Sequence, residues 1–166
     1  MKGFSTHQYL LRTGQSRCYN AGGGEIPCPG PTPRFRTAED GVIDVLTGLC
    51  WRRDADLCGG PVSWTEALEA VRTLNHGAGT REGWRLPNIN ELASLVDCAR
   101  HSPALPAQHP FRSVGEEYWS STTSAFEPDW AWALYLAKGA VGVGQKGGRH
   151  FRVWPVRDAA LLPAPS

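Results

Sequence analysis

The chain has 166 residues, a formal net charge of +1, 41% hydrophobic residues and 20% charged residues. This length suits one domain with a single core, and the near-zero charge excludes a generally basic nucleic-acid-binding protein. With 19 Gly, 13 Pro and 7 Trp, the sequence predicts short elements and long connections around large aromatic anchors.

The beginning of the chain is rich in Gly, Pro and Arg. It predicts an extended N-terminal arm (residues 1–38), ahead of a folded domain (39–158) and a short flexible tail (159–166). The start has no apolar run long enough for a signal peptide, and no later stretch approaches membrane-spanning length. The chain is therefore either cytosolic or trimmed at its start, and its cysteine content favours trimming.

Five cysteines suit an oxidising compartment, and the odd number leaves at least one unpaired or shared between chains. Cys18 and Cys28 bracket a Gly-rich loop in the arm, which predicts a local disulfide between them. Cys50, Cys58 and Cys98 allow one further bridge, and the sequence leaves its pair open.

The folded part is predicted to begin with strands. Residues 41–53, GVIDVLTGLCWRR, place apolar residues on either side of a Thr-Gly turn, which indicates a hairpin or two short strands. The clearest helix follows in SWTEALEAVRTLN, where Ser63 and Glu66 have the spacing of a capping box. One face of this helix is predicted to be apolar, with Trp64, Ala67, Leu68, Val71 and Leu74.

The stretch GWRLPNINELASLVD predicts a second helix. Pro87 prevents the helix from extending backward, Asn88 can cap it, and Glu91 stands at its third position. We interpret the stretch as scaffold, with Arg85 held in a hydrogen-bond network with Glu91 or a backbone carbonyl. The residues predicted to have structural roles are Trp84, Arg85, Pro87, Glu91 and Trp119.

The C-terminal half holds a Pro-rich loop, the run EYWSSTTS, and three strand-like pieces separated by Lys-Gly and Gln-Lys-Gly-Gly turns. The first piece alternates Trp130, Trp132 and Leu134 with smaller residues, as a half-buried strand does. Two helices followed by a terminal antiparallel meander predict an α+β domain. In the SSTT run, the hydroxyls are expected to serve as turn and backbone partners.

Several motifs occur in an order that resembles one protein family. They are TGQSRCYNAGGGEIPCPG, DVLTGLCW, SWTEAL, GWRLPNINELASLVD, FRSVGEEYWSSTT, AWALYLAKGAV and FRVWPVRD. Together they resemble the Lcl C-terminal-like domain family of bacterial surface and secreted proteins. The resemblance implies a C-type-lectin-like fold, similar to that of formylglycine-generating enzymes, with two helices, twisted antiparallel sheet or hairpins and much irregular loop.

The resemblance also bears on function and on the cysteines. Some family members are adhesins that bind sulfated glycosaminoglycans, and the ligand face is implied to lie in the irregular C-terminal half. Cys50 stands where Met is usual in the family and Cys98 where an aromatic residue is common, so a bridge between these two is allowed. The sequence VWPVR replaces an Arg-Cys-Val-Arg-like strand, which implies that no disulfide anchors the last strand.

The sequence predicts no enzyme, no cofactor and no metal site. The enzymes of the implied fold act through late cysteines, and no cysteine follows Cys98. His101, His109 and His150 have no metal-binding spacing. The Glu-Pro-Asp sequence that begins at Glu127 offers half of a calcium-dependent sugar motif, but the next strand supplies no further carboxylate or amide, so a polar turn is expected.

Charge is distributed unevenly along the chain. Residues 130–157 contain no acidic residue, whereas residues 39–69 contain seven of the sixteen carboxylates. The basic segment fits either a solvated face or an anion-binding surface. Its candidate ligand-binding residues, on or beside turns, are Tyr135, Lys138, Gln145, Lys146, Arg149, His150 and Arg152.

These observations predict a non-enzymatic recognition or adhesion domain, secreted or at the cell surface, that binds an anionic glycan or a surface protein. One alternative is a structural module of a larger surface assembly, with the arm as its handle and a homo-oligomer as its form. Another is a receptor-binding protein diversified by a retroelement. Neither nucleic acid nor insertion into a membrane is expected.

Overall fold

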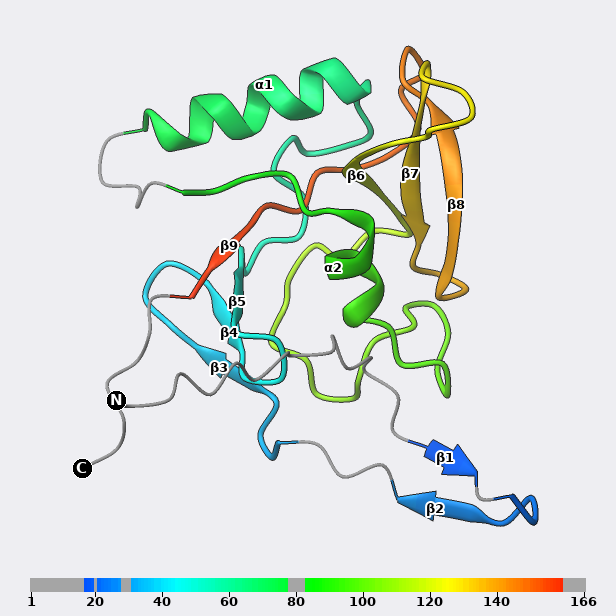
Figure 1. Cartoon of the computed structure of the whole chain (residues 1–166). Coiled ribbons are helices and arrows are strands. Elements are labelled where there is room, and N and C mark those ends of the chain that lie inside the picture. The colour runs from blue at the N-terminus through cyan, green and yellow to red at the C-terminus, as the bar shows by residue number, and fades with distance from the viewer. Residues whose placement is uncertain (1–16, 20, 28–30, 78–82, 160–166) are drawn as a thin grey trace, which may run out of the picture.

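The computed structural model describes residues 17–19, 21–27, 31–77 and 83–159. The elements in chain order are β1 (Arg17–Tyr19), β2 (Glu25–Pro27), β3 (Phe35–Thr37), β4 (Val42–Asp44), β5 (Leu49–Trp51), α1 (Trp64–Asn75), α2 (Ile89–Ser94), β6 (Glu117–Thr123), β7 (Trp130–Tyr135), β8 (Ala140–Gln145) and β9 (Val156–Asp158). Two helices, antiparallel sheets and long connections confirm the predicted α+β class (Figure 1).

The strands form a β1-β2 hairpin, a four-stranded sheet in the order β3-β4-β5-β9, and a three-stranded sheet in the order β6-β7-β8. All neighbouring strands are antiparallel. The predicted terminal meander is wrong in its last strand, because β9 pairs with β5 in the other sheet and β6 completes the meander. After β8 the chain bonds to β6 at Arg152 and then continues to the other sheet, with residues 153–156 almost fully buried.

Two aromatic clusters form the core. In the first, Trp154 contacts Trp51, Phe111 and Tyr118, with ring centroids 5.5, 4.7 and 5.1 Å apart. In the second, Trp119 packs against Phe151 at 4.3 Å. These rings connect the four-stranded sheet, the three-stranded sheet and the long loops, so a chain with short elements still buries a core.

Both predicted helices are present and begin at the predicted caps. Ser63 accepts a hydrogen bond from the Glu66 amide, and the Glu66 carboxylate accepts one from the Ser63 amide at 2.8 Å. Asn88 and Glu91 make the same reciprocal pair at α2, at 2.9 and 2.8 Å. Each capping box satisfies amides that the first turn would otherwise leave without partners.

The four-stranded sheet includes residues from the predicted arm. Phe35–Thr37 forms β3 and pairs with β4. Just before it, Arg34 donates from Nε and Nη2 to the carboxylate of Asp44, at 2.9 and 2.7 Å, and from Nη2 to the Ser94 carbonyl at 2.8 Å. Because the Asp44 side chain is fully buried, Arg34 is an integral part of the folded unit.

The structure also bears on the cysteines. The bridge that was allowed between Cys50 and Cys98 is not formed. Cys50 is buried in the second core cluster, Cys98 lies exposed after α2, and neither forms a disulfide. Cys58 is an exposed thiol. Cys18 lies in β1 opposite Ile26, but Cys28 lies outside the described residues, so the bridge between Cys18 and Cys28 stays a prediction.

The described helices are short. The longer of the two, α1, has 12 residues, and within the described part of the chain no helix has the length and apolar character needed to cross a membrane.

Candidate functional site

The predicted ligand-binding residues lie at both ends of the β7-β8 hairpin. Tyr135 and Lys138 are at the turn between the strands, and the other members are at or beyond the far end of β8. Six residues of strand span roughly 20 Å. The set therefore forms two separate groups, with Gln145, Lys146, Arg149, His150 and Arg152 in the second.

The arginines of the basic segment form ion pairs with the acidic segment. Arg149 Nη1 lies 3.0 Å from Glu66 Oε1, and Arg152 is paired with Asp56. Asp40 binds Arg157 in the same way, at 2.6 Å between Oδ2 and Nη2. The uneven charge along the sequence is thus largely cancelled in space, and the less exposed pairs of Arg152 and Arg157 link distant segments of the chain.

Lys146 is held against the protein by its own contacts. Its ammonium lies 4.3 Å from the ring centroid of Trp64 and donates to Thr123 Oγ1 at 3.0 Å and to the Pro128 carbonyl at 2.8 Å. Trp64 in turn donates from Nε1 to the Ser120 carbonyl at 2.8 Å. Lys146 therefore ties the turn before β7 to the start of α1, and the cation-π contact keeps the ammonium in place.

Tyr135 lies across the inner face of the hairpin. Its hydroxyl donates to the Val143 carbonyl at 3.1 Å, and its ring packs against Phe151 at 5.6 Å. Gly142 makes room for this ring, because a Cβ there would lie 2.7 Å from the Tyr135 Cε2. Partial burial raises the pKa of Tyr135, so the hydroxyl stays a donor at neutral pH.

An apolar surface is exposed on the other side of the hairpin. Trp132 is 37% exposed and Val141 is 44% exposed. Trp132 pairs with Val143, and Trp130 pairs with Gln145, so these side chains lie on the same face as Val141. We call this surface the outer face, and define it as Trp130, Trp132, Val141, Val143 and Gln145.

Sequence reasoning did not identify the outer face as a site. Alternation grouped Trp132 with Leu134 on one face, which is correct, but only Leu134 is covered. Leu92 and Leu95, in α2 and just after it, share a core cluster with Leu134, whereas α2 is too short to cover Trp132 as well. The two glycines of β8 could have indicated the outer face. Gly142 and Gly144 lie against aromatic rings on the inner face, so the valines that alternate with them lie on the outer face.

In the stretch interpreted as scaffold, the entrance of α2 is bonded to β9 of the four-stranded sheet. Arg85 donates from Nη1 and Nη2 to the two carboxylate oxygens of Glu91, each at 2.6 Å. Its backbone pairs with Val156 of β9 in both directions, at 2.8 and 3.0 Å. Trp84 is 3% exposed and Trp119 is fully buried. These contacts fasten the entrance of α2 to the four-stranded sheet.

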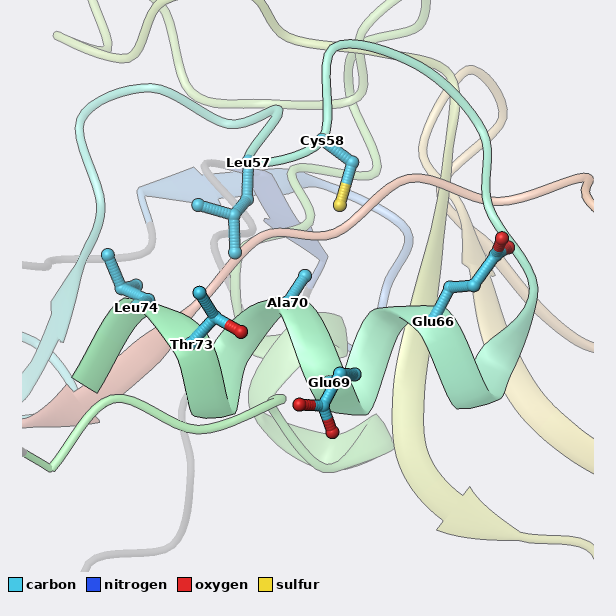
Figure 2. A pocket seen from close by; sticks show the side chains of 7 residues that line it. All are labelled: Leu57, Cys58, Glu66, Glu69, Ala70, Thr73 and Leu74. Atoms are coloured by element: carbon cyan, nitrogen blue, oxygen red, sulfur yellow. The ribbon is translucent and has the colours of Figure 1, made fainter. Parts of the chain in front are cut away.

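A shallow groove of 480 Å³ runs beside α1 (Figure 2). Leu57 and Cys58 line one side of the groove, opposite the helix. The other lining residues belong to α1, namely Glu66, Glu69, Ala70, Thr73 and Leu74. Partial burial, followed by the charges of Asp56 and Glu66, raises the pKa of the Cys58 thiol. The thiol is therefore protonated at neutral pH and is a poor nucleophile.

His109 predicts a pH dependence of stability. Burial lowers its pKa below the ordinary 6.5, its ring stacks on Phe111 at 5.8 Å, and its Nδ1 is buried with no partner among the described residues. The unfolded chain therefore binds this proton at higher pH than the folded chain does. The free energy of unfolding should fall as the pH drops below about 6.5, by at most about 1.4 kcal/mol per pH unit, until His109 is protonated in the folded state too.

Urea unfolding followed between pH 7.5 and pH 5 checks this expectation. His109→Phe, which keeps a ring beside Phe111, should remove this part of the slope. The same slope in both proteins would show that His109 is not responsible.

Comparison with known proteins adds one finding. A family model described as the Lcl C-terminal domain is similar to residues 40–157, well over half of the chain. The first and last matched residues, Asp40 and Arg157, form an ion pair. The buried residues of both core clusters and the outer face lie inside the matched range. No curated protein matches the chain.

Proposed function

The chain belongs to the Lcl C-terminal domain family, and from this we propose that it is a non-enzymatic recognition domain that binds a glycan on the outer face of the β7-β8 hairpin. The observation that carries the proposal is the partial exposure of Trp132, 37%, on the outer face of a three-stranded sheet. If the ligand is instead a protein at a cell surface, it would bind the same apolar face. Location outside the cell or on its surface is part of this proposal.

The chemistry of the outer face suits a sugar. The electron-rich face of an indole attracts the C–H groups that line one side of a pyranose ring. Gln145, exposed two residues from Val143 on the same face, offers both a donor and an acceptor for sugar hydroxyls. Aromatic stacking beside a polar amide supports carbohydrate binding more directly than the paired arginines do.

Lys138 supports an anionic ligand. It is exposed at the turn of the hairpin, just beyond the Val141 end of the outer face. A sugar chain that lies along the hairpin from Gln145 would present its next sulfate or carboxylate group to this ammonium. Binding that uses Lys138 should weaken as salt is added, because exposed charges are screened.

Binding to a glycan array and to a heparin column tests the proposal. Trp132→Ala should weaken binding about tenfold, the loss expected for one aromatic contact. Lys138→Ala should lower the salt concentration at which the protein elutes. Phe126→Ala is the matched control, because Phe126 is 92% exposed but lies in the turn before β7, outside the outer face. Absence of retention at low salt, or equal binding by Trp132→Ala, would refute the glycan proposal.

A further inference from the structure

Within the described part of the chain, no strand pairs with the outer edge of the three-stranded sheet. β8 is its outermost strand, and its sequence, AVGVGQ, contains neither a charge nor a proline. The edge of the other sheet is different, because β3 carries the exposed Arg36. Charged residues and prolines are the usual protection of an edge strand against pairing with another chain. An apolar edge beside an exposed apolar face is therefore expected to have an occupant.

The backbone of β8 presents its hydrogen-bonding groups outward at the two valines. The Lys146 amide donates to the Asp129 carbonyl at 2.9 Å, so position 146 faces β7. Successive residues of a strand face opposite edges, which directs the amides and carbonyls of Val141 and Val143 away from β7. The Val143 carbonyl already accepts from the Tyr135 hydroxyl, and its second lone pair stays available.

We propose that β8 pairs with β8 of a second copy of this chain, antiparallel, about a two-fold axis at Gly142. In this register Val141 of each copy lies opposite Val143 of the other, and each pair exchanges two backbone hydrogen bonds. The repeat Val-Gly-Val is self-complementary about its glycine, as the symmetric interface of a dimer must be. The two sheets join into one continuous sheet.

Charge complementarity favours a second copy over an unrelated strand. The two-fold axis brings the turn of one hairpin, with Lys138, beside the open end of the other hairpin, with Glu127 and Asp129. All three side chains are exposed, whereas the Lys146 ammonium at that open end is held inward over Trp64. The same attraction occurs twice, once at each end of the paired strands.

The proposed dimer also joins the two outer faces. The Trp132 side chains of the two copies would lie on the same surface, roughly 15 Å apart from the usual strand spacing and rise. A dimer of this form presents two aromatic sites to one polymeric ligand. The pairing itself does not depend on the proposed glycan binding.

Sedimentation of the purified full chain without any glycan, over a range of concentrations, tests the pairing. The wild-type protein should be in a concentration-dependent equilibrium between monomer and dimer. Val143→Lys places one introduced lysine from each copy on either side of the two-fold axis at Gly142. Repulsion between the like charges should raise the dimer dissociation constant at least about tenfold. Val45→Lys is the matched control, because Val45 is 38% exposed beside the other sheet and should leave the dimer unchanged.

A charge exchange gives a second, independent measurement. Lys138→Glu should weaken the dimer, and adding Glu127→Lys to that variant should restore it. A wild-type monomer at all concentrations, or a dimer that Val143→Lys leaves intact, overturns the proposal. Loss of glycan binding in a protein that still dimerises would count against the proposed function alone.

Discussion

Asp44→Ala is expected to lower the free energy of unfolding by about 3–5 kcal/mol, the range for removing one partner of a buried ion pair. Asp44 is fully buried and accepts two hydrogen bonds from Arg34. It also accepts the Leu46 amide at 3.0 Å, which shapes the turn after β4. The substitution leaves the Arg34 guanidinium, only 11% exposed, without its counter-charge. Urea unfolding monitored by circular dichroism measures the loss.

A surface ion pair provides the control for this prediction. Arg72 and Glu69 on α1 are 2.9 Å apart but are 69% and 62% exposed. Arg72→Ala should change the free energy of unfolding by no more than about 0.5 kcal/mol. Equal losses in the two variants would mean that the burial of Asp44 does not matter.

The same ion pair shows what the sequence could and could not predict. A single Asp among the apolar residues of GVIDVLTGLCW indicates that a buried charge needs a partner. Nothing local identifies that partner as Arg34, because the residues from Arg34 to Asp44 read as the end of an extended arm followed by a hairpin. Arg34 also reaches the Ser94 carbonyl, sixty positions along the chain, and such distant contacts leave no periodic pattern.

Local signals were sufficient for the helices. Each capping box joins residues three positions apart, so both helix starts could be predicted from spacing alone. The position of β9 could not be predicted in this way, because its sequence would suit a strand in either sheet. Its pairing with β5 goes with the burial of Trp154, which depends on residues distant in the sequence. The outer face was missed for the same reason, since the exposure of Trp132 depends on how far α2 extends over the sheet.

The segregation of charge along the chain is a second feature whose partners are distant in sequence. The basic segment was expected to be a solvated or ligand-binding face. Its arginines pair with the acidic segment, as Arg152 does with Asp56 and Arg157 with Asp40. A domain whose two ends have opposite charges can close on itself in this way, and the net charge of +1 is consistent with such pairing.

Arg85→Ala is expected to lower the free energy of unfolding by about 2–3 kcal/mol and to leave ligand affinity of the folded protein unchanged. The Glu91 carboxylate is 9% exposed and would lose both of its 2.6 Å partners, which is the costly step. The expected loss of stability is smaller than for Asp44→Ala because Arg85 is 41% exposed, so water replaces part of the interaction. The Asn88 amide still donates to Glu91, which should preserve the start of α2.

Arg85→Lys separates charge from geometry in this prediction. Lysine keeps the positive charge but cannot give two parallel hydrogen bonds to one carboxylate, so it should recover only part of the lost stability. Stability is measured by urea unfolding, and affinity by the glycan assays used for Trp132→Ala. Affinity should not change because Arg85 pairs with Val156 of β9 in the four-stranded sheet, whereas the outer face belongs to the three-stranded sheet. Unchanged stability with lost binding would instead place the ligand at the entrance of α2, where Arg85 and Glu91 would have to serve as the binding pair.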